Sequence, residues 1–235
     1  MSTALSKTIL FFKNVLVPII FLLIVVGYII DDLWTNSGSN QWEAQKTDNS
    51  IAIYSLKAPG DPLLKYKVKT RVKASLSNVV AYITNENTAK DIGITDLVRL
   101  EEIESEPLFV AYDAYTVALP DPFGKREVVI QLQYSQDPDT KQVEVNVLAA
   151  PHKKPRDSDT KRMVYLSNTW LLTPAEDGYV EIEAISEVDF QIPYFVANSV
   201  LADVISEQFT IMQNLLKTEK YQRREAAFIH ELASI

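Results

Sequence analysis

The sequence predicts an α+β fold in which a curved antiparallel sheet wraps around a long C-terminal helix, with a transmembrane helix at the N-terminus. Apolar and polar residues alternate through several segments between residues 51 and 190, which is the period of strands with one buried face. An apolar-striped segment follows Pro193, and its spacing is that of a helix. Residues 14–30 carry no charged side chain, which is typical of a membrane span.

The N-terminal apolar run extends over residues 9–30 and contains a single charged side chain, Lys13. Its length matches the roughly 20 residues that a helix needs to cross a bilayer. Lys7 and Lys13 lie toward the N-terminal side, whereas Asp31 and Asp32 follow the run. The positive-inside rule therefore predicts a single-pass membrane protein with a cytoplasmic N-terminus and its remaining chain on the periplasmic, extracytoplasmic side.

Two fates of this segment are considered. After Ile30 the chain has no convincing A-x-A-like site for cleavage, which favours an uncleaved signal anchor. The alternative is a secreted or periplasmic protein released by signal cleavage. We expect four parts in either case: an anchor or uncleaved signal over 1–30, a polar spacer over 31–48, a folded domain over 42–217 that overlaps the spacer, and a helical extension or tail over 218–235.

Composition excludes two classes of function. The chain has no cysteine, so it holds no disulfide framework, thiol nucleophile or zinc–thiolate site. The first 30 residues contain two of the 23 basic residues and none of the 31 acidic ones, so the remainder carries ten more acidic than basic side chains. A domain of this charge repels phosphate backbones, and we expect no nucleic-acid partner.

The folded domain is expected to hold eight strands and two helices. A short helix runs to about Thr84, because Ser75 or Ser77 can cap its N-terminus and apolar residues follow at helical spacing. Turn residues separate the alternating segments. The expected strands span residues 51–56, 64–74, 97–104, 108–118, 125–136, 141–149, 161–173 and 178–190.

The final helix is the element around which the domain is organised. One face of it carries an apolar stripe at spacings of three and four, and a second stripe lies beside the first. Two interpretations remain open: the helix closes a solid core, or it covers a cavity for an apolar ligand. The first stripe is Leu201, Ile205, Phe209, Met212 and Leu216, and the second is Val196, Val200 and Val204.

Four stretches of the sequence together suggest a family. They are Trp42 followed by IAIY at 51–54, LPDPFGKREVV at 119–129, WLLTP at 170–174 and DFQIPYFVAN at 189–198. In this order they resemble the START (steroidogenic acute regulatory protein-related lipid-transfer) family, bacterial type, within the Bet v 1-like helix-grip superfamily. The chain departs from the family pattern in three ways: Glu127 replaces the usual aspartate, the glycine before Ile192 is missing, and residues 85–96 lack a tryptophan.

The resemblance implies a helix-grip fold with a tunnel between the sheet and the last helix. Such a tunnel holds one lipid or other hydrophobic small molecule, is gated by the loop at 119–124, and exchanges its ligand with a membrane. Burying each CH₂ group of a ligand there gains about 0.8 kcal/mol. We expect no enzymatic reaction, catalytic residue, metal or cofactor.

Candidate ligand-binding residues come from the strands and from the start of the last helix. Val128, Ile130, Val145, Val147 and Trp170 are expected to form an apolar wall, although core packing alone would also explain Trp170. Polar groups that orient a headgroup are expected at Tyr115, Arg126, Glu127 and Asn168, and Phe195 completes the set. The alternative for Arg126 and Glu127 is a structural ion pair at the start of a strand.

Two other classes of function are kept as alternatives. A polyketide cyclase or aromatase would use the same cavity, but His152 and His230 are the only histidines, and neither has an obvious partner carboxylate and nucleophile at telling spacing. An interaction module would fill the cavity with its own side chains. The basic loop at 152–162 is interpreted as solvated, with contact to an anionic membrane as its alternative.

Overall fold

The computed structural model describes residues 12–48, 50–156 and 159–232, and the described chain divides into two compact units. Residues up to Gln41 and the turn Lys57–Pro62 form the first unit. Trp42–Leu56 and Leu63–Ile235 form the second. The expected anchor residue Lys7 and the start of the apolar run at residue 9 lie outside the described residues.

The first unit is built on one long apolar helix. A π-helical turn, η1 (Phe12–Leu16), leads into α2 (Val17–Asn36). Residues Lys13–Asn36 form a candidate membrane span of 24 residues, by length and composition. The helix continues beyond Ile30 because no glycine or proline interrupts residues 31–36, and Asn36 Nδ2 donates to the Asp32 carbonyl at 3.0 Å.

The expected spacer at 31–48 is therefore wrong in extent. Residues 31–36 are helical, and a strand begins at Trp42, so 37–41 are the only residues between helix and sheet. That strand, WEAQKTD, is exposed along nearly its whole length and pairs with a single neighbour. An edge strand of this kind has no apolar alternation, which is why its sequence resembles that of a spacer.

The second unit contains a sheet to which the described chain contributes ten strands, in the order β1-β2-β3-β10-β9-β7-β6-β5-β4, with β8 beside β6. The pairing of β8 with β6 is parallel, and the other registered pairs are antiparallel. The strands are β1 (Trp42–Asp48), β2 (Ile51–Lys57), β3 (Leu64–Lys73), β4 (Val98–Ser105), β5 (Leu108–Ala118), β6 (Lys125–Gln136), β7 (Val143–Ala149), β8 (Lys161–Arg162), β9 (Leu166–Ala175) and β10 (Tyr179–Val188).

The expected α+β fold is confirmed. The segment 161–173 differs in detail, because it is split into β8 and β9 by an irregular stretch, and η2 (Glu176–Gly178) forms the turn into β10. Alternation decides which face is buried: along β3, Tyr66, Val68 and Val72 are buried, whereas the intervening basic residues are partly or fully exposed. The buried faces of neighbouring strands form one continuous core.

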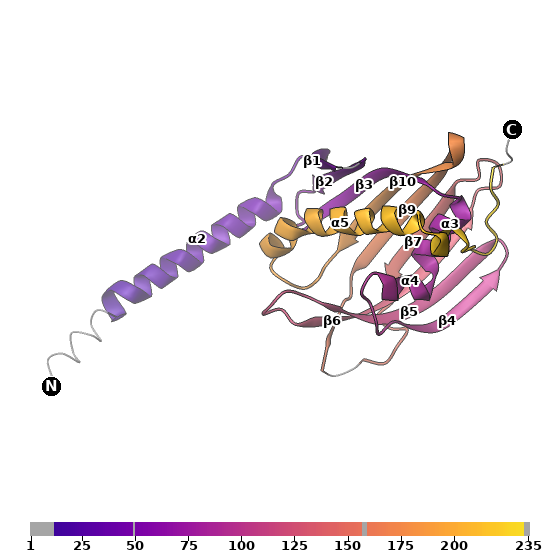
Figure 1. Ribbon diagram of the computed structural model, residues 1–235. Coiled ribbons are helices and arrows are strands. Elements are labelled where there is room, and N and C mark those ends of the chain that lie inside the picture. Colours follow the sequence, from indigo (N-terminus) through magenta and orange to yellow (C-terminus); the bar gives the residue numbers. More distant parts are fainter. Residues whose placement is uncertain (1–11, 49, 157–158, 233–235) are drawn as a thin grey trace. The chain divides into compact units, whose positions relative to one another are not determined.

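The long helix α5 (Tyr194–Leu216) lies across one face of the curved sheet (Figure 1). Phe209, Met212 and Leu216 of the expected apolar stripe are fully buried against this face. The second expected stripe is wrong as a buried surface, because Val200 and Val204 are 40% and 46% exposed. They project to the side of the helix, so the buried arc is narrower than the sequence pattern suggests.

Two short helices precede the central strands. Helix α3 (Leu76–Thr84) begins as expected, with the Ser75 hydroxyl accepting from the Asn78 amide at 3.0 Å. Helix α4 (Glu86–Asp91) follows at once, and its N-cap Asn85 accepts from the Asn87 amide. Helix α4 has only six residues, so its sequence shows little helical periodicity.

The C-terminal segment is packed onto α3. After α6 (Glu219–Gln222) the described residues 223–232 are non-helical. Oxygens of the Glu231 carboxylate accept from the amides of Leu76 at 3.1 Å and Ser77 at 2.9 Å. Asn78 Nδ2 donates to the Arg224 carbonyl at 2.6 Å. We call residues 217–232 the C-terminal strap, since they hold the first turn of α3 from outside the sheet.

Candidate functional site

A cavity of about 320 Å³ lies between the sheet and α5. Strand alternation builds its floor, because every second residue of the central strands points to the face that α5 covers. Its volume is within the range of small-molecule sites, at the lower end. The floor is formed by apolar residues of five strands: Val68, Ile130, Leu132, Val147, Trp170 and Ala184.

The roof of the cavity comes from α5. Phe209 lies over Trp170, with ring centroids 5.1 Å apart and ring planes 18° apart. This stack joins the helix to strand β9 and forms one wall of the cavity. Met212, one turn further along the helix, lines the cavity as well.

The side wall and the mouth come from α4, the segment after it and α5. Glu86, Val204 and Gln208 line the cavity and are also exposed at the surface. The cavity therefore reaches solvent between α4 and α5. The loop at 119–124, expected to act as a gate, contributes no lining residue, and its gating role stays a prediction.

A buried ion pair lies beside the cavity. Arg99 Nε donates to Asp113 Oδ1 at 2.6 Å, and Arg99 Nη2 donates to Asp113 Oδ2 at 3.2 Å and to the Thr84 carbonyl at 2.8 Å. Arg99 also pairs with Glu102. Asp113 is 3% exposed and lines the cavity. Burial raises the pKa of its carboxyl, against the opposing effect of the Arg99 guanidinium.

Two further polar groups reach the cavity. Burial, with a smaller contribution from the Asp113 charge, raises the pKa of Tyr115 to about 12, so its phenol is neutral. Asn168 Oδ1 is buried and, among the described residues, accepts no hydrogen bond. Tyr115 comes from β5 and Asn168 from β9.

The structure brings five of the ten predicted site residues to the cavity: Tyr115, Ile130, Val147, Asn168 and Trp170. Val128 and Val145 lie in the same core and are 1% and 0% exposed, but they are packed outside the cavity lining. Phe195 lies on the first turn of α5 and is 64% exposed. The predicted wall positions of Val128 and Val145 and the predicted ligand contact of Phe195 are therefore absent from the cavity lining. Burial alone does not determine which side chains border the open volume.

Arg126 is a structural clamp in this geometry. It is 2% exposed, and its guanidinium donates to carbonyl oxygens of two segments that are far apart in the sequence. The acceptors are Phe123 at 2.8 Å, Lys125 at 3.0 Å, Phe190 at 2.8 Å and Gln191 at 3.3 Å. Arg126 thus ties the 119–124 loop to the approach of α5. It does not line the cavity.

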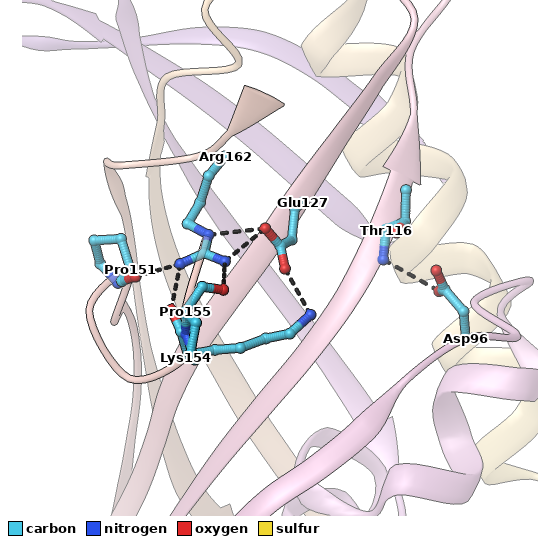
Figure 2. Close-up of polar contacts among 7 residues, drawn as sticks. All are labelled: Asp96, Thr116, Glu127, Pro151, Lys154, Pro155 and Arg162. Carbon is cyan, nitrogen blue, oxygen red and sulfur yellow. Dashed lines mark hydrogen bonds and ion pairs between the residues drawn. The ribbon is translucent and has the colours of Figure 1, made fainter. Parts of the chain in front are cut away.

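Glu127 is not paired with Arg126, in contrast to the expected alternative. Its Oε2 accepts from Arg162 Nη2 at 2.7 Å, and its Oε1 accepts from Lys154 Nζ at 2.7 Å (Figure 2). Burial would raise the pKa of Glu127, but the hydrogen bonds from Lys154 and Arg162 outweigh it and hold this pKa below its usual range. The basic loop expected to be solvated is in part held by this carboxylate.

Asp96 lies near this cluster and accepts from the Thr116 amide at 3.1 Å (Figure 2). These groups border a small polar pocket that includes Glu127 and Lys154. Glu127 and Lys154 are paired with each other, and Asp96 is hydrogen-bonded to a backbone amide.

Sequence reasoning missed Asp113, which lines the cavity with its charge paired to Arg99. A signal was present: in the strand at 108–118, residues 111, 113 and 115 share a face, and the middle one is a carboxylate on an otherwise apolar side. An acid at an inward position requires a buried partner. The sequence pattern does not name that partner, because Arg99 belongs to the neighbouring strand and meets Asp113 through strand register.

No protein-family model matches the chain, and no curated protein does. Solved structures do. The STAR-related lipid transfer protein of Xanthomonas axonopodis (fragment 25–204) has a TM-score of 0.66 at 21% identity, over 75% of this chain and 99% of that one. Human STARD10 has a TM-score of 0.65 at 13% identity, over 79% and 76% of the two chains.

The fold is START-like. Human StAR-related lipid transfer protein 5 agrees, with a TM-score of 0.62 at 14% identity over 75% of this chain and 86% of that chain. In the START-like domain the sheet grips α5, and the cavity lies where these two layers do not fill the space between them.

Proposed function

We propose that this chain binds one apolar ligand in the cavity under α5 and exchanges it with the membrane to which α2 anchors it. The observation that carries the proposal is the cavity itself: about 320 Å³ of space bordered mainly by aliphatic and aromatic side chains, inside a START-like domain. Cavities of this kind bind apolar molecules because burial removes the ligand's surface from water.

Binding without turnover agrees with the chemistry of the lining. Among the described lining residues, Glu86 and Asp113 are the acids, and none is lysine, arginine or histidine. Asp113 is committed to Arg99, and Glu86 lies at the exposed mouth. A general acid and a general base held against a buried substrate are therefore not assembled from the described residues.

Helix α2 supports the membrane part of the proposal. The span Lys13–Asn36 is long and apolar enough to cross a bilayer. Residues 37–41 alone separate it from β1, and five extended residues reach about 17 Å. Such a short tether keeps a START-like domain at the membrane surface, where its local concentration for lipid exchange is high.

The end of the domain at which the tether enters also supports exchange. By strand register, Trp42, Leu64, Val188 and Leu166 lie at one end of the sheet. Near these residues in the sequence are three exposed apolar side chains. They are Val164, Tyr165 and Phe195, which are 58%, 49% and 64% exposed. Apolar groups at such a position suit contact with lipid.

Ligand binding is tested by filling the cavity. Ala184 lies on the floor and pairs in register with Trp170 and Val68. We expect Ala184→Phe to lower the amount of bound lipid by about tenfold or more, while overpacking typically costs about 1–3 kcal/mol of stability. The measurement is mass spectrometry of lipid extracted from the full chain purified in an amphipathic polymer.

The matched control is Leu148→Phe. Leu148 is 40% exposed on the outer side of β7, so the added ring has solvent around it and bound lipid should be unchanged. Equal lipid in both variants would contradict the cavity as the binding site. A wild-type protein that carries no lipid and takes none up from vesicles would contradict ligand binding altogether.

Anchoring and topology are tested with introduced cysteines, since the chain has none of its own. We propose that the N-terminus is cytoplasmic and the domain periplasmic. In a bacterial host, a membrane-impermeant maleimide should label the Ser39→Cys variant in intact spheroplasts. It should label the Ser2→Cys variant only after the spheroplasts are lysed. The reverse pattern would overturn the orientation, and an intact mass lacking residues 1–30 would show that the anchor is removed.

A further inference from the structure

Strand β4 is an open edge of the sheet (Figure 1). Among the described strands it pairs with β5 alone, at the end of the strand order. All of its residues except Arg99 are exposed. Within the described chain, no backbone–backbone hydrogen bond outside the ladder with β5 involves residues 98–105. The backbone groups of β4 that point away from β5 are therefore available to another strand.

The opposite edge of the sheet, β1, is protected against such pairing. Strand β1 exposes no large apolar side chain, a bulge interrupts its register, and Lys46 pairs with Asp203 of α5. Bulges and charges discourage the addition of a strand. Strand β4 instead exposes Val98 and Ile103, by 58% and 46%, and beyond its own bulge Glu101–Ser105 keep an unbroken register with β5. Of the two edges, β4 is the one suited to accept a strand.

The side chains of β4 determine which strand fits. Glu102 and Glu104 lie opposite buried residues of β5, so they are on the side of the sheet that α5 covers. Ile103, between them, is on the outer side. Glu102 pairs with Arg99, whereas Glu104 has no ion-pair partner among the described residues. The edge is therefore acidic on one face and apolar on the other.

This distribution of charge disfavours a second copy of β4 as the partner. Two copies joined edge to edge would bring the acidic side chains of 101–104 close to their counterparts, and like charges on neighbouring strands are destabilising. An anionic lipid surface is repelled for the same reason. A strand whose basic residues face Glu102 and Glu104 and whose apolar residues lie beside Ile103 is complementary on both faces.

We propose that β4 binds an extended segment of another protein in which basic residues alternate with apolar ones, and that this segment extends the sheet by one strand. The backbone ladder supplies affinity, and the alternation of Glu102, Ile103 and Glu104 supplies selectivity. The described residues of β4 contribute nothing to the lining of the cavity, so this inference does not depend on the proposed function.

The test uses a synthetic peptide, KVKVKVK, blocked at both ends. It is titrated into the full chain, held in a non-ionic amphipathic polymer at physiological ionic strength, and binding is followed by calorimetry. One control peptide, EVEVEVE, reverses the charge. The other has the sequence KVKVKVK with N-methylated backbone amides, which keeps the side chains and removes the backbone donors. We expect the unmodified KVKVKVK to bind at least about tenfold more tightly than either control, because binding requires both the charge and the ladder.

Two matched variants and hydrogen exchange locate the peptide. Glu104→Lys should weaken the binding of KVKVKVK about fivefold or more, since an attraction becomes a repulsion. Glu144→Lys makes the same change of charge at an exposed residue of β7, an interior strand, and should leave binding unchanged. With KVKVKVK bound, amides of Glu101–Ser105 should exchange more slowly, and those of β1 should exchange at their former rate.

Equal binding of the N-methylated peptide would mean that charge alone attracts KVKVKVK, and would overturn the addition of a strand. Loss of binding in both variants or in neither would overturn the assignment to β4, as would protection confined to other strands. Absence of KVKVKVK binding would refute the inference outright. Protection of β4 that increases with protein concentration in the peptide-free chain would show that a second copy occupies the edge instead.

Discussion

Replacing Arg162 by methionine is expected to lower the free energy of unfolding of the START-like domain by about 3–5 kcal/mol, the usual cost of breaking a buried ion pair from one side. Arg162 and Glu127 are 6% and 5% exposed. Arg162 Nε and Nη2 donate to Glu127 Oε2 at 2.9 and 2.7 Å. Without the guanidinium, a buried carboxylate keeps Lys154 as its remaining ionic partner.

Arg162 also donates hydrogen bonds to the preceding loop, and their loss adds to the expected decrease in the free energy of unfolding. Its guanidinium donates to the carbonyls of Pro151, Lys154 and Pro155 at 2.6–2.7 Å (Figure 2). Three carbonyls of the loop before β8 lose their donor in Arg162→Met. Methionine has the length of the arginine stem but no donor, so the variant isolates the hydrogen bonds from the packing.

Chemical denaturation of the full chain, followed by near-ultraviolet circular dichroism, measures this loss. Lys153→Met is the control, because Lys153 pairs with Glu101 where both side chains are substantially exposed, and such pairs contribute about 1 kcal/mol or less. Equal losses in the two variants would contradict a structural role for the buried pair.

The ion pair between Glu127 and Arg162 also makes the free energy of unfolding depend on pH. The pKa of Glu127 is lower in the folded state than its usual value, so the unfolded chain binds the proton more readily as the pH falls. The stabilisation is complete above the unfolded carboxyl pKa of about 4.3 and is lost as the pH falls through the lower folded value. The gap between wild type and Arg162→Met should therefore be constant from neutral pH to about pH 5.5 and narrow in stronger acid. A gap that widens in acid would contradict this account.

The sequence predicted the fold well where one period runs through a whole element. In 64–74, alternation identified both the strand and its buried side; in 125–136 it identified the strand, but residues 126–130 are buried on both faces. It failed at β1, because an exposed edge strand needs no apolar face, and at Val200 and Val204, because two stripes of a helix need not both be covered. The local sequence pattern does not predict the exposure of a side chain when that exposure depends on tertiary packing.

The candidate site was predicted in part, for a related reason. Trp170 was placed on the inward face of its strand, and Tyr115 and Asn168 were chosen as polar groups; all three line the cavity. Whether a residue on that face meets open space or its neighbours depends on the curvature of the sheet. The partners of Glu127 come from a loop about 30 residues further along the chain, and no spacing rule connects them.

The C-terminal strap bears on the cavity through one residue, Tyr221. Its side chain is 0% exposed, and its ring lies 5.6 Å from that of Tyr82, which lines the cavity. Its hydroxyl donates to Asp91 Oδ2 at 2.5 Å, at the end of α4. Hydrogen bonds from Lys220 and Tyr221 hold the pKa of Asp91 below its usual range, so this carboxylate is charged and the link persists at neutral pH.

Tyr221→Ala should therefore destabilise the domain by about 3–5 kcal/mol, as large-to-small changes of buried aromatic residues do, and should free the wall that α4 provides. Tyr221→Phe keeps the ring and loses the hydrogen bond to a charged acceptor, which is worth about 1.5–3 kcal/mol. Chemical denaturation measures the free energy of unfolding of both variants. Hydrogen exchange shows which segments lose protection. Under native conditions the amides of α4 and the C-terminal strap should exchange faster in both variants. The amides of β6 and β7 should exchange through global unfolding alone, at a rate set by the global stability. Unchanged protection of α4 in Tyr221→Phe would mean that the strap stabilises the core without positioning the cavity wall.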